Sequence, residues 1–176
     1  MCDNMVVCVT IPFDTTRQEE EWSRKQQLAR RIQTFALDCG LGVHFSLAEF
    51  GVPFHVALIK HLGMGPDSRG SRNPGAIAFE LTSGPLMTCI ENAIPSPIRR
   101  DFPNVEASPL YRFLAEVFST ADFSSVYVYF GTEDDLPQSR LHRVTVDEFL
   151  ALFKTASQLD YGIYEIRLGG TDSLRP

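Results

Sequence analysis

The residues best suited to acid–base chemistry gather in one stretch, residues 43–63, which holds three of the four histidines of the chain. Ser46 follows His44 at a spacing of two, and residues i and i+2 of a strand share one face. His55 opens a similar pattern, with Ala57 in place of the hydroxyl. An imidazole can move a proton while a neighbouring hydroxyl holds a phosphate oxygen. This stretch therefore predicts a site for phosphoryl chemistry.

The two histidine patterns are expected to form a hairpin of two short strands with its turn at residues 51–53. In that register His44 pairs near Ile59 and points to the same face as Ser46 and His55. Two imidazoles on one face, one acting as acid and one as base, would form a catalytic pair. A shift of one residue would send the two rings to opposite faces. The alternative is that these are polar positions of a half-exposed sheet.

Positive charge that would neutralise a phosphate is expected at the end of this hairpin. Lys60 closes its second strand, and Arg69 and Arg72 follow in the loop GMGPDSRGSRNPG, residues 63–75. Such charges matter because the catalysis of phosphoryl transfer is mostly positioning and electrostatics. The loop lacks the Gly-Lys-Ser/Thr ending of a P-loop, and its composition is typical of a surface loop.

One α+β domain, residues 1–176, is expected to position these residues, with helices packed on one face of a mainly antiparallel sheet. Its ends, residues 1–4 and 171–176, are expected to fray. Alternating or continuous apolar runs predict strands and 3.6-residue periodicity predicts helices. Besides the hairpin, the predicted strands are 5–13, 76–82, 124–130 and 161–168, and the predicted helices are 16–39, 108–118 and one starting at 145.

The helix starts carry recognisable capping signals. Thr16 with Glu19, and Thr145 with Glu148, fit the capping box, and Ser108 precedes a proline at the first helical position. In the first helix the apolar residues fall near one face, and the charged residues are expected to form a solvated surface. The apolar set is Trp22, Ala29, Ile32, Ala36 and Cys39, and the charged set is Arg17, Arg24, Lys25, Arg30 and Arg31.

The net charge and the composition of the chain indicate which kinds of binding partner it could have. The net charge of −6 opposes binding to long duplex nucleic acid, which needs a basic surface. It leaves room for a nucleotide or a short RNA end, and it favours a basic protein partner. No secretory signal and no membrane-length apolar run is visible, so a cytoplasmic protein without membrane contact is expected. The four cysteines form no C-x-x-C pair and are expected to be free thiols, with no metal or cofactor.

These features together resemble the 2H phosphoesterases, a superfamily that includes RNA cyclic phosphodiesterases. MVVCVTIPF followed by a helix is similar to the opening of that family, and HFSLAEFG to its first His-x-Ser/Thr-apolar motif. LYRFLAEVF leading into SSVYVYFG resembles the middle of the family, and DEFLALF before YGIYEIRLGG resembles its end. The resemblance implies an α+β fold and phosphodiesterase chemistry, with two histidines from two such motifs lining one cleft.

The resemblance implies that the second motif falls on Ser125-Val126-Tyr127, which contains no histidine. Ser125 and Tyr127 then become substrate-binding positions. His142 lies nearby in LHRVTV, with Val144 in the hydroxyl position. Three alternatives follow: the second motif is lost, His142 or His55 serves as the second proton carrier, or only the fold is shared.

Two functions are consistent with these observations. The first is a 2H phosphoesterase-like protein that binds or hydrolyses a nucleotide or an RNA-end cyclic phosphodiester. The second is a non-catalytic acidic interaction protein, such as an inhibitor, an immunity-type protein or a subunit of a complex. The missing second motif and the net charge favour the second, and the order of elements around His44 favours the first.

Overall fold

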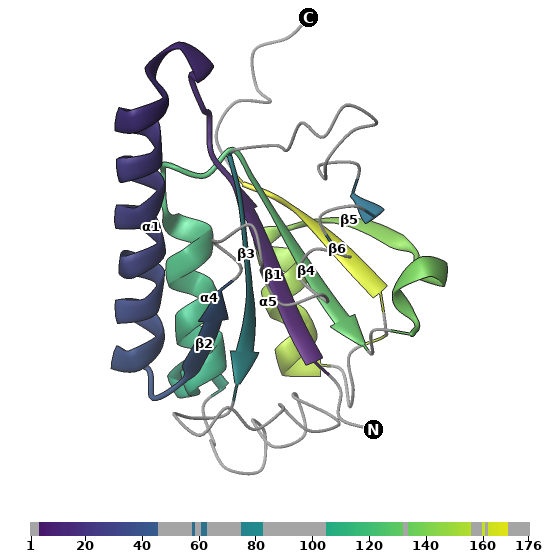
Figure 1. Ribbon diagram of the computed structural model, residues 1–176. Coiled ribbons are helices and arrows are strands. Elements are labelled where there is room, and N and C mark those ends of the chain that lie inside the picture. The colour runs from purple at the N-terminus through teal and green to yellow at the C-terminus, as the bar shows by residue number, and fades with distance from the viewer. Residues whose placement is uncertain are drawn as a thin grey trace, which may run out of the picture.

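The computed structural model describes residues 4–45, 58, 61–62, 75–82, 105–131, 134–155, 160 and 162–168. Its strands form one six-stranded sheet in the order β2-β3-β1-β4-β6-β5 (Figure 1). Neighbouring strands are antiparallel except β5 and β6, which are parallel. The strands are β1 Asn4–Thr10, β2 Gly42–Phe45, β3 Ala76–Thr82, β4 Ser125–Gly131, β5 Leu141–Thr145 and β6 Gly162–Arg167.

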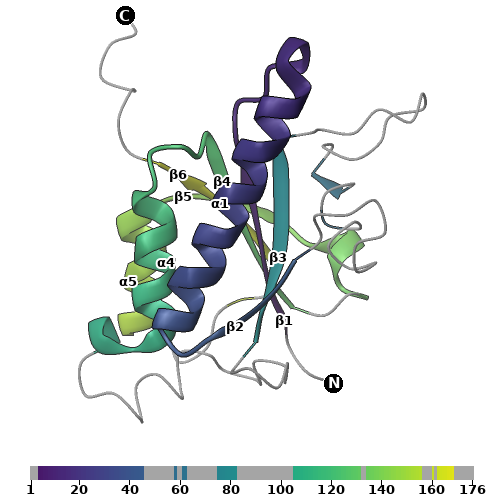
Figure 2. The ribbon, with the colours of Figure 1, turned by 60° about the vertical axis from the view of Figure 1, so that its left-hand side comes forward.

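Three helices, α1 Gln18–Asp38, α4 Pro109–Ser119 and α5 Val146–Thr155, pack on one face of the sheet. In Figure 1 α4 and α5 lie behind the strands and α1 runs beside β2, and Figure 2 shows α4 and α5 together on the same side. The described helices and strands listed above follow, from β1 to β4, the order β-α-β-β-α-β of a split βαβ fold, which β5, α5 and β6 extend. The predicted α+β class and mainly antiparallel sheet are confirmed.

The main core lies between the sheet and these helices. Met5, Val7 and Val9 of β1 are fully buried in it, because alternate residues of a strand face the same side. One face of α4 is buried in it, with Leu110, Phe113, Leu114, Val117 and Phe118. Phe113 of α4 meets Phe79 of β3 edge-on, with ring centroids 6.1 Å apart.

A smaller cluster lies on the opposite face, which we call the second face of the sheet. It consists of buried residues, Val6, Cys8, Leu58, Ala76, Ala78, Tyr129, Leu136 and Ile163. The central strands β1 and β4 are therefore buried on both sides, as the continuous apolar run of β1 indicates. Cys8 and Cys39 are free thiols, as expected for the cysteines in the described part of the chain.

The helix starts follow two of the three predicted caps. The Thr145 N–H donates to Glu148 Oε2 at 2.7 Å and the Glu148 N–H donates to Thr145 Oγ1 at 3.1 Å, which is a complete capping box. Ser108 accepts from the Tyr111 N–H at 3.3 Å. The Thr16 prediction is wrong, because the turn Thr15–Arg17 precedes α1 and Asp14 caps it by accepting from the Thr16 N–H at 2.9 Å.

Two residues of α1 lie in environments that differ from the predicted pattern. Lys25, expected in solvent, is only 5% exposed, whereas Trp22, a member of the predicted apolar face, is 41% exposed. Lys25 precedes the buried Leu28 by three and Ile32 by seven, which is the spacing of the core-facing stripe. Its Nζ lies 4.7 Å from the centroid of the Trp22 ring, and burial lowers the pKa of Lys25 to about 8.

The prediction of a histidine hairpin is wrong where its second strand is described, and its first strand has another partner. His44 of β2 pairs with Glu80 of β3. Within the expected second strand, Leu58 is helical, and its carbonyl accepts from the Leu62 N–H at 3.0 Å, an i to i+4 bond. Leu58 and Leu62 are four residues apart, which is the spacing of one face of a helix, and both pack on the second face. A short apolar run in a sequence fits both the strand and the helix period, so the pattern alone did not separate them.

Several expectations fall outside the described residues. These are the positions of Ser46, His55 and Lys60, the loop at 63–74 with its arginines, and the frayed ends at 1–3 and 171–176. Asn4, which was expected to fray, belongs to β1.

Candidate functional site

The structure separates the predicted histidines. His44 is in β2 and His142 is in β5, and these strands form the two opposite edges of the sheet. Five strand spacings of about 4.8 Å put their backbones about 24 Å apart. One phosphodiester cannot touch both, so the prediction that His142 is the second proton carrier beside His44 is wrong. The side chain of His44 lies outside the described atoms, as do Ser46, His55 and Lys60.

His142 is packed on the helix side of the sheet. Its ring stacks on Tyr164 of β6, with centroids 5.1 Å apart and planes 23° apart. Tyr164 in turn meets Phe149 of α5 edge-on at 5.3 Å, and its hydroxyl donates to the Asp160 carbonyl at 2.9 Å. A Cβ added at Gly162 would lie 3.1 Å from the imidazole, so this glycine leaves the space that the ring fills. These contacts give His142 a structural role.

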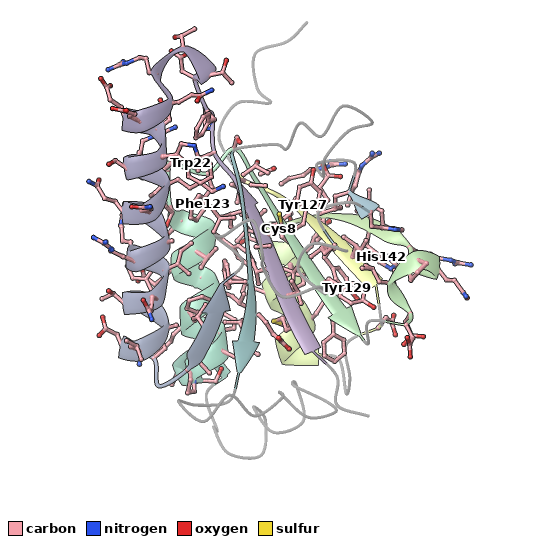
Figure 3. The ribbon with its side chains drawn as sticks, in the orientation of Figure 1. Cys8, Trp22, Phe123, Tyr127, Tyr129 and His142 are labelled. Atoms are coloured by element: carbon pink, nitrogen blue, oxygen red, sulfur yellow. The ribbon has the colours of Figure 1, made fainter. Side chains whose placement is uncertain are left out.

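Tyr127 faces the other way and lies half-buried on the second face. Across the sheet it pairs with Cys8 of β1 on one side and with Glu165 of β6 on the other. Glu165 pairs with Arg143 of β5, whose Nε donates to Glu165 Oε2 at 2.9 Å. In Figure 3 Cys8, Tyr127 and Tyr129 lie on the central strands, with His142 beyond them on the edge strand. Tyr127 and His142 therefore belong to opposite faces.

Ser125 belongs to a cluster of hydroxyl groups at one end of β1 and β4. The hydroxyl of Thr10 lies 2.9 Å from that of Ser124 and within hydrogen-bond contact of that of Ser125. The Ser124 hydroxyl also donates to the Thr10 carbonyl at 3.0 Å. Thr10 is buried, Ser125 is half-buried and Ser124 is exposed, so the two serines present the accessible edge of this cluster.

Arg167 completes the group at this end of the sheet. Val126 pairs with Ile166, and extending that register by one residue puts Ser125 beside Arg167, which is exposed. We call the resulting set the second-face patch: Thr10, Ser125, Tyr127, Arg143, Glu165 and Arg167. It spans three strand spacings and two residues along the strands, about 14 Å by about 7 Å, which is the size of a nucleotide.

The Tyr127 phenol and the Cys8 thiol of the second face are held in their neutral forms. Burial, and then the charge of Glu165, raise the pKa of Tyr127, and a hydrogen bond with Ser125 offsets part of that rise. Burial raises the pKa of Cys8 to about 12, so the thiol is not a nucleophile at neutral pH. Tyr127 thus offers a neutral phenol and a ring face to a ligand, with two guanidinium groups on neighbouring strands.

Metal binding and membrane insertion find no support in the described residues. No group of three or more histidine, cysteine or acidic side chains in that part of the chain could hold a metal ion. No helix in the described ranges is long and apolar enough to cross a bilayer.

Comparison with known proteins yields no relative. The chain matches no protein-family model, no curated protein and no solved structure. The resemblance to the 2H phosphoesterases therefore stays a hypothesis that depends on the quoted motifs.

The patch residues that the motif alignment did not name are Thr10, Arg143, Glu165 and Arg167. The alternation in YGIYEIRL was the available signal, because residues 163, 165 and 167 of one strand share a face. The sequence did not indicate which strands pair with that strand. The pairing of β6 with β4 and β5 depends on contacts between residues far apart in the chain.

Proposed function

We propose that this protein binds a nucleotide or a short RNA end carrying a phosphodiester, and that it does so on the second-face patch without turning the ligand over. The observation that carries the proposal is that Tyr127, Ser125 and two arginines share one face within the span of a nucleotide. This is the binding form of the phosphoesterase hypothesis.

The chemistry of the patch supports a phosphate ligand. Arg143 and Arg167 are each exposed and carry fixed positive charge, which pairs well with phosphate oxygens. Glu165 orients the Arg143 guanidinium through the 2.9 Å bond, which leaves its remaining donors for a ligand. The net charge of these three side chains is +1, so the patch is locally positive on a chain whose net charge is −6.

We expect the base of the ligand to stack on the ring of Tyr127. Stacking of a base on an aromatic side chain contributes about 1–3 kcal/mol and tolerates any base. The hydroxyl of Ser125 lies at the same end of β4 and serves as a donor to the sugar or the phosphate. We infer that the ligand is not hydrolysed at the patch, because the stacked ring of His142 faces the helices and does not supply a proton carrier there.

The test is a titration of the protein with 2′,3′-cyclic AMP by isothermal calorimetry, with phosphorus NMR of the same samples to detect hydrolysis. We expect binding without hydrolysis. Tyr127→Ala is expected to weaken the affinity about 10-fold, as lost stacking predicts. Arg167→Gln is expected to weaken it and to reduce its dependence on salt concentration, because one phosphate contact is removed.

Arg30→Gln is the matched control, since Arg30 is exposed on α1, on the helix side, and the substitution makes the same charge change. Equal losses in Arg30→Gln and Arg167→Gln would refute the assignment of the site. Steady hydrolysis by the wild-type protein would refute a purely binding role and restore the phosphodiesterase hypothesis.

A further inference from the structure

Strand β5 is an edge of the sheet with one partner among the described strands. It pairs with β6 on its inner side, and no other described strand lies beyond it. Edge strands present unpaired backbone groups to solvent and are ready templates for another strand. β5 is visible as an outermost strand of the sheet in Figure 1.

The backbone N–H and C=O groups of alternate residues in β5 point away from the sheet. The Arg140 carbonyl accepts from the Ile163 N–H of β6 at 2.9 Å. In a parallel pair every second residue turns both backbone groups to its neighbour, so the even-numbered residues face β6. The N–H and C=O groups of Leu141 and Arg143 therefore face away from the sheet. The Thr145 N–H also faces outward, and Glu148 already accepts its hydrogen bond.

The side chains around this edge define what would bind there. Leu141 is a large apolar residue that is 46% exposed, in line with Ile163 of the second-face cluster. Exposed charged side chains lie within and on both sides of the strand in the sequence: Asp134, Asp135, Arg140, Arg143, Asp147 and Glu148. Four are negative and two are positive, so an added strand would meet an apolar anchor on a stretch with a net charge of −2.

A second copy of this chain fits the edge poorly. Each copy carries a net charge of −6, and a symmetric antiparallel pairing centred on β5 would put Arg143 opposite Arg143. A segment with basic and apolar residues in alternation avoids both repulsions when its apolar residues lie opposite Leu141 and Arg143 and its basic residues lie on the other face. We propose that β5 receives an extended, basic segment of a partner protein, which joins the sheet as an additional strand.

The experiment uses an eight-residue peptide of alternating valine and lysine as the probe. Two control peptides are used: alternating glycine and lysine, which keeps the charge but disfavours a strand, and alternating valine and glutamate. Fluorescence anisotropy measures the affinities, and amide hydrogen exchange by NMR follows Leu141 and Arg143. We expect the valine–lysine peptide to bind at least 10-fold more tightly than either control and to slow exchange at both amides at least 10-fold.

Two variants locate the binding. Leu141→Pro removes an outward N–H at the first residue of the strand, where proline is tolerated, and is expected to weaken binding at least 10-fold. Asp134→Asn with Asp147→Asn is expected to weaken binding, whereas Asp38→Asn with Glu116→Gln makes the same charge change on α1 and α4 and should leave it unchanged.

Three results would overturn the proposal. One is equal binding of the valine–lysine and glycine–lysine peptides. Another is slow exchange of the Leu141 and Arg143 amides in the free protein, which would mean that the edge is already covered. The third is a concentration-dependent dimer, seen by sedimentation, that Leu141→Pro dissociates, which would assign the edge to a second copy.

Discussion

His142 stacks on Tyr164 above Gly162, and its environment differs from that of a proton carrier in an open cleft. We expect His142→Ala to lower the free energy of unfolding by about 1 kcal/mol, because an aromatic pair contributes about 0.5–1.5 kcal/mol. Binding of 2′,3′-cyclic AMP should be unchanged. Urea unfolding followed by circular dichroism measures the stability, and calorimetry measures the binding.

His61→Ala is the control for this substitution, since His61 is exposed in the described helical turn and its removal should leave stability unchanged. Loss of ligand binding in His142→Ala, with stability retained, would return His142 to the list of site residues.

Lys25 gives the stability of the protein a defined dependence on pH. Its pKa is about 8 in the folded protein and 10.5 ordinarily, so between these values the unfolded chain binds more protons than the folded one. Stability therefore rises as pH increases through this window, by at most about 1.4 kcal/mol per pH unit from this group. Below pH 8 the cost of burying the charge is fully present.

We expect Lys25→Met to remove this rise. The measurement is the difference in the free energy of unfolding between wild type and variant at pH 7.5 and at pH 9.5. Cys8, whose raised pKa lowers stability above pH 9, is present in both proteins. Subtracting the free energy of unfolding of the variant from that of the wild type therefore cancels its contribution. An identical pH dependence in both proteins would contradict the assignment.

At the scale of elements, the capping box at the start of α5 joins the edge strand β5 to its helix. Thr145→Ala removes one of the two reciprocal bonds and should lower the free energy of unfolding by about 1 kcal/mol. Thr145→Ser keeps the hydroxyl and should retain most of the stability. Urea unfolding of the three proteins checks this prediction, and equal losses in the two variants would show that the hydroxyl makes no contribution.

The elements that could be predicted are those with local signals. Ser108 before Pro109 and the capping box at Thr145 fix two helix starts within a few residues, and the structure confirms both. The turn around Leu58 could not be separated from a strand, because its apolar run is short and fits both periods. Thr16 was expected to cap the first helix, but Asp14 is the capping residue and accepts a hydrogen bond from the Thr16 N–H. The spacing of the residues alone does not decide which of two neighbouring polar side chains becomes the cap.

At the scale of the whole molecule, the class of fold follows from the order of elements, but strand neighbours do not. The separation of His44 from His142 comes entirely from the sheet order, which puts their strands at opposite edges. The second-face patch arises in the same way, because the pairing of β1, β4, β6 and β5 brings together residues from four separate parts of the chain. Ser125 and Tyr127 were named from a motif alignment, whereas their arginine neighbours depend on this pairing.

The exposed Trp22 has a spectroscopic consequence. It is the only indole in the chain and lies outside both apolar clusters, against Phe13 and beneath the ammonium of Lys25. Its emission reports on the first turns of α1 and on the protonation of Lys25, and it is a poor gauge of cooperative loss of the sheet. A fluorescence titration with alkali should therefore show a transition near pH 8 in the fully folded protein.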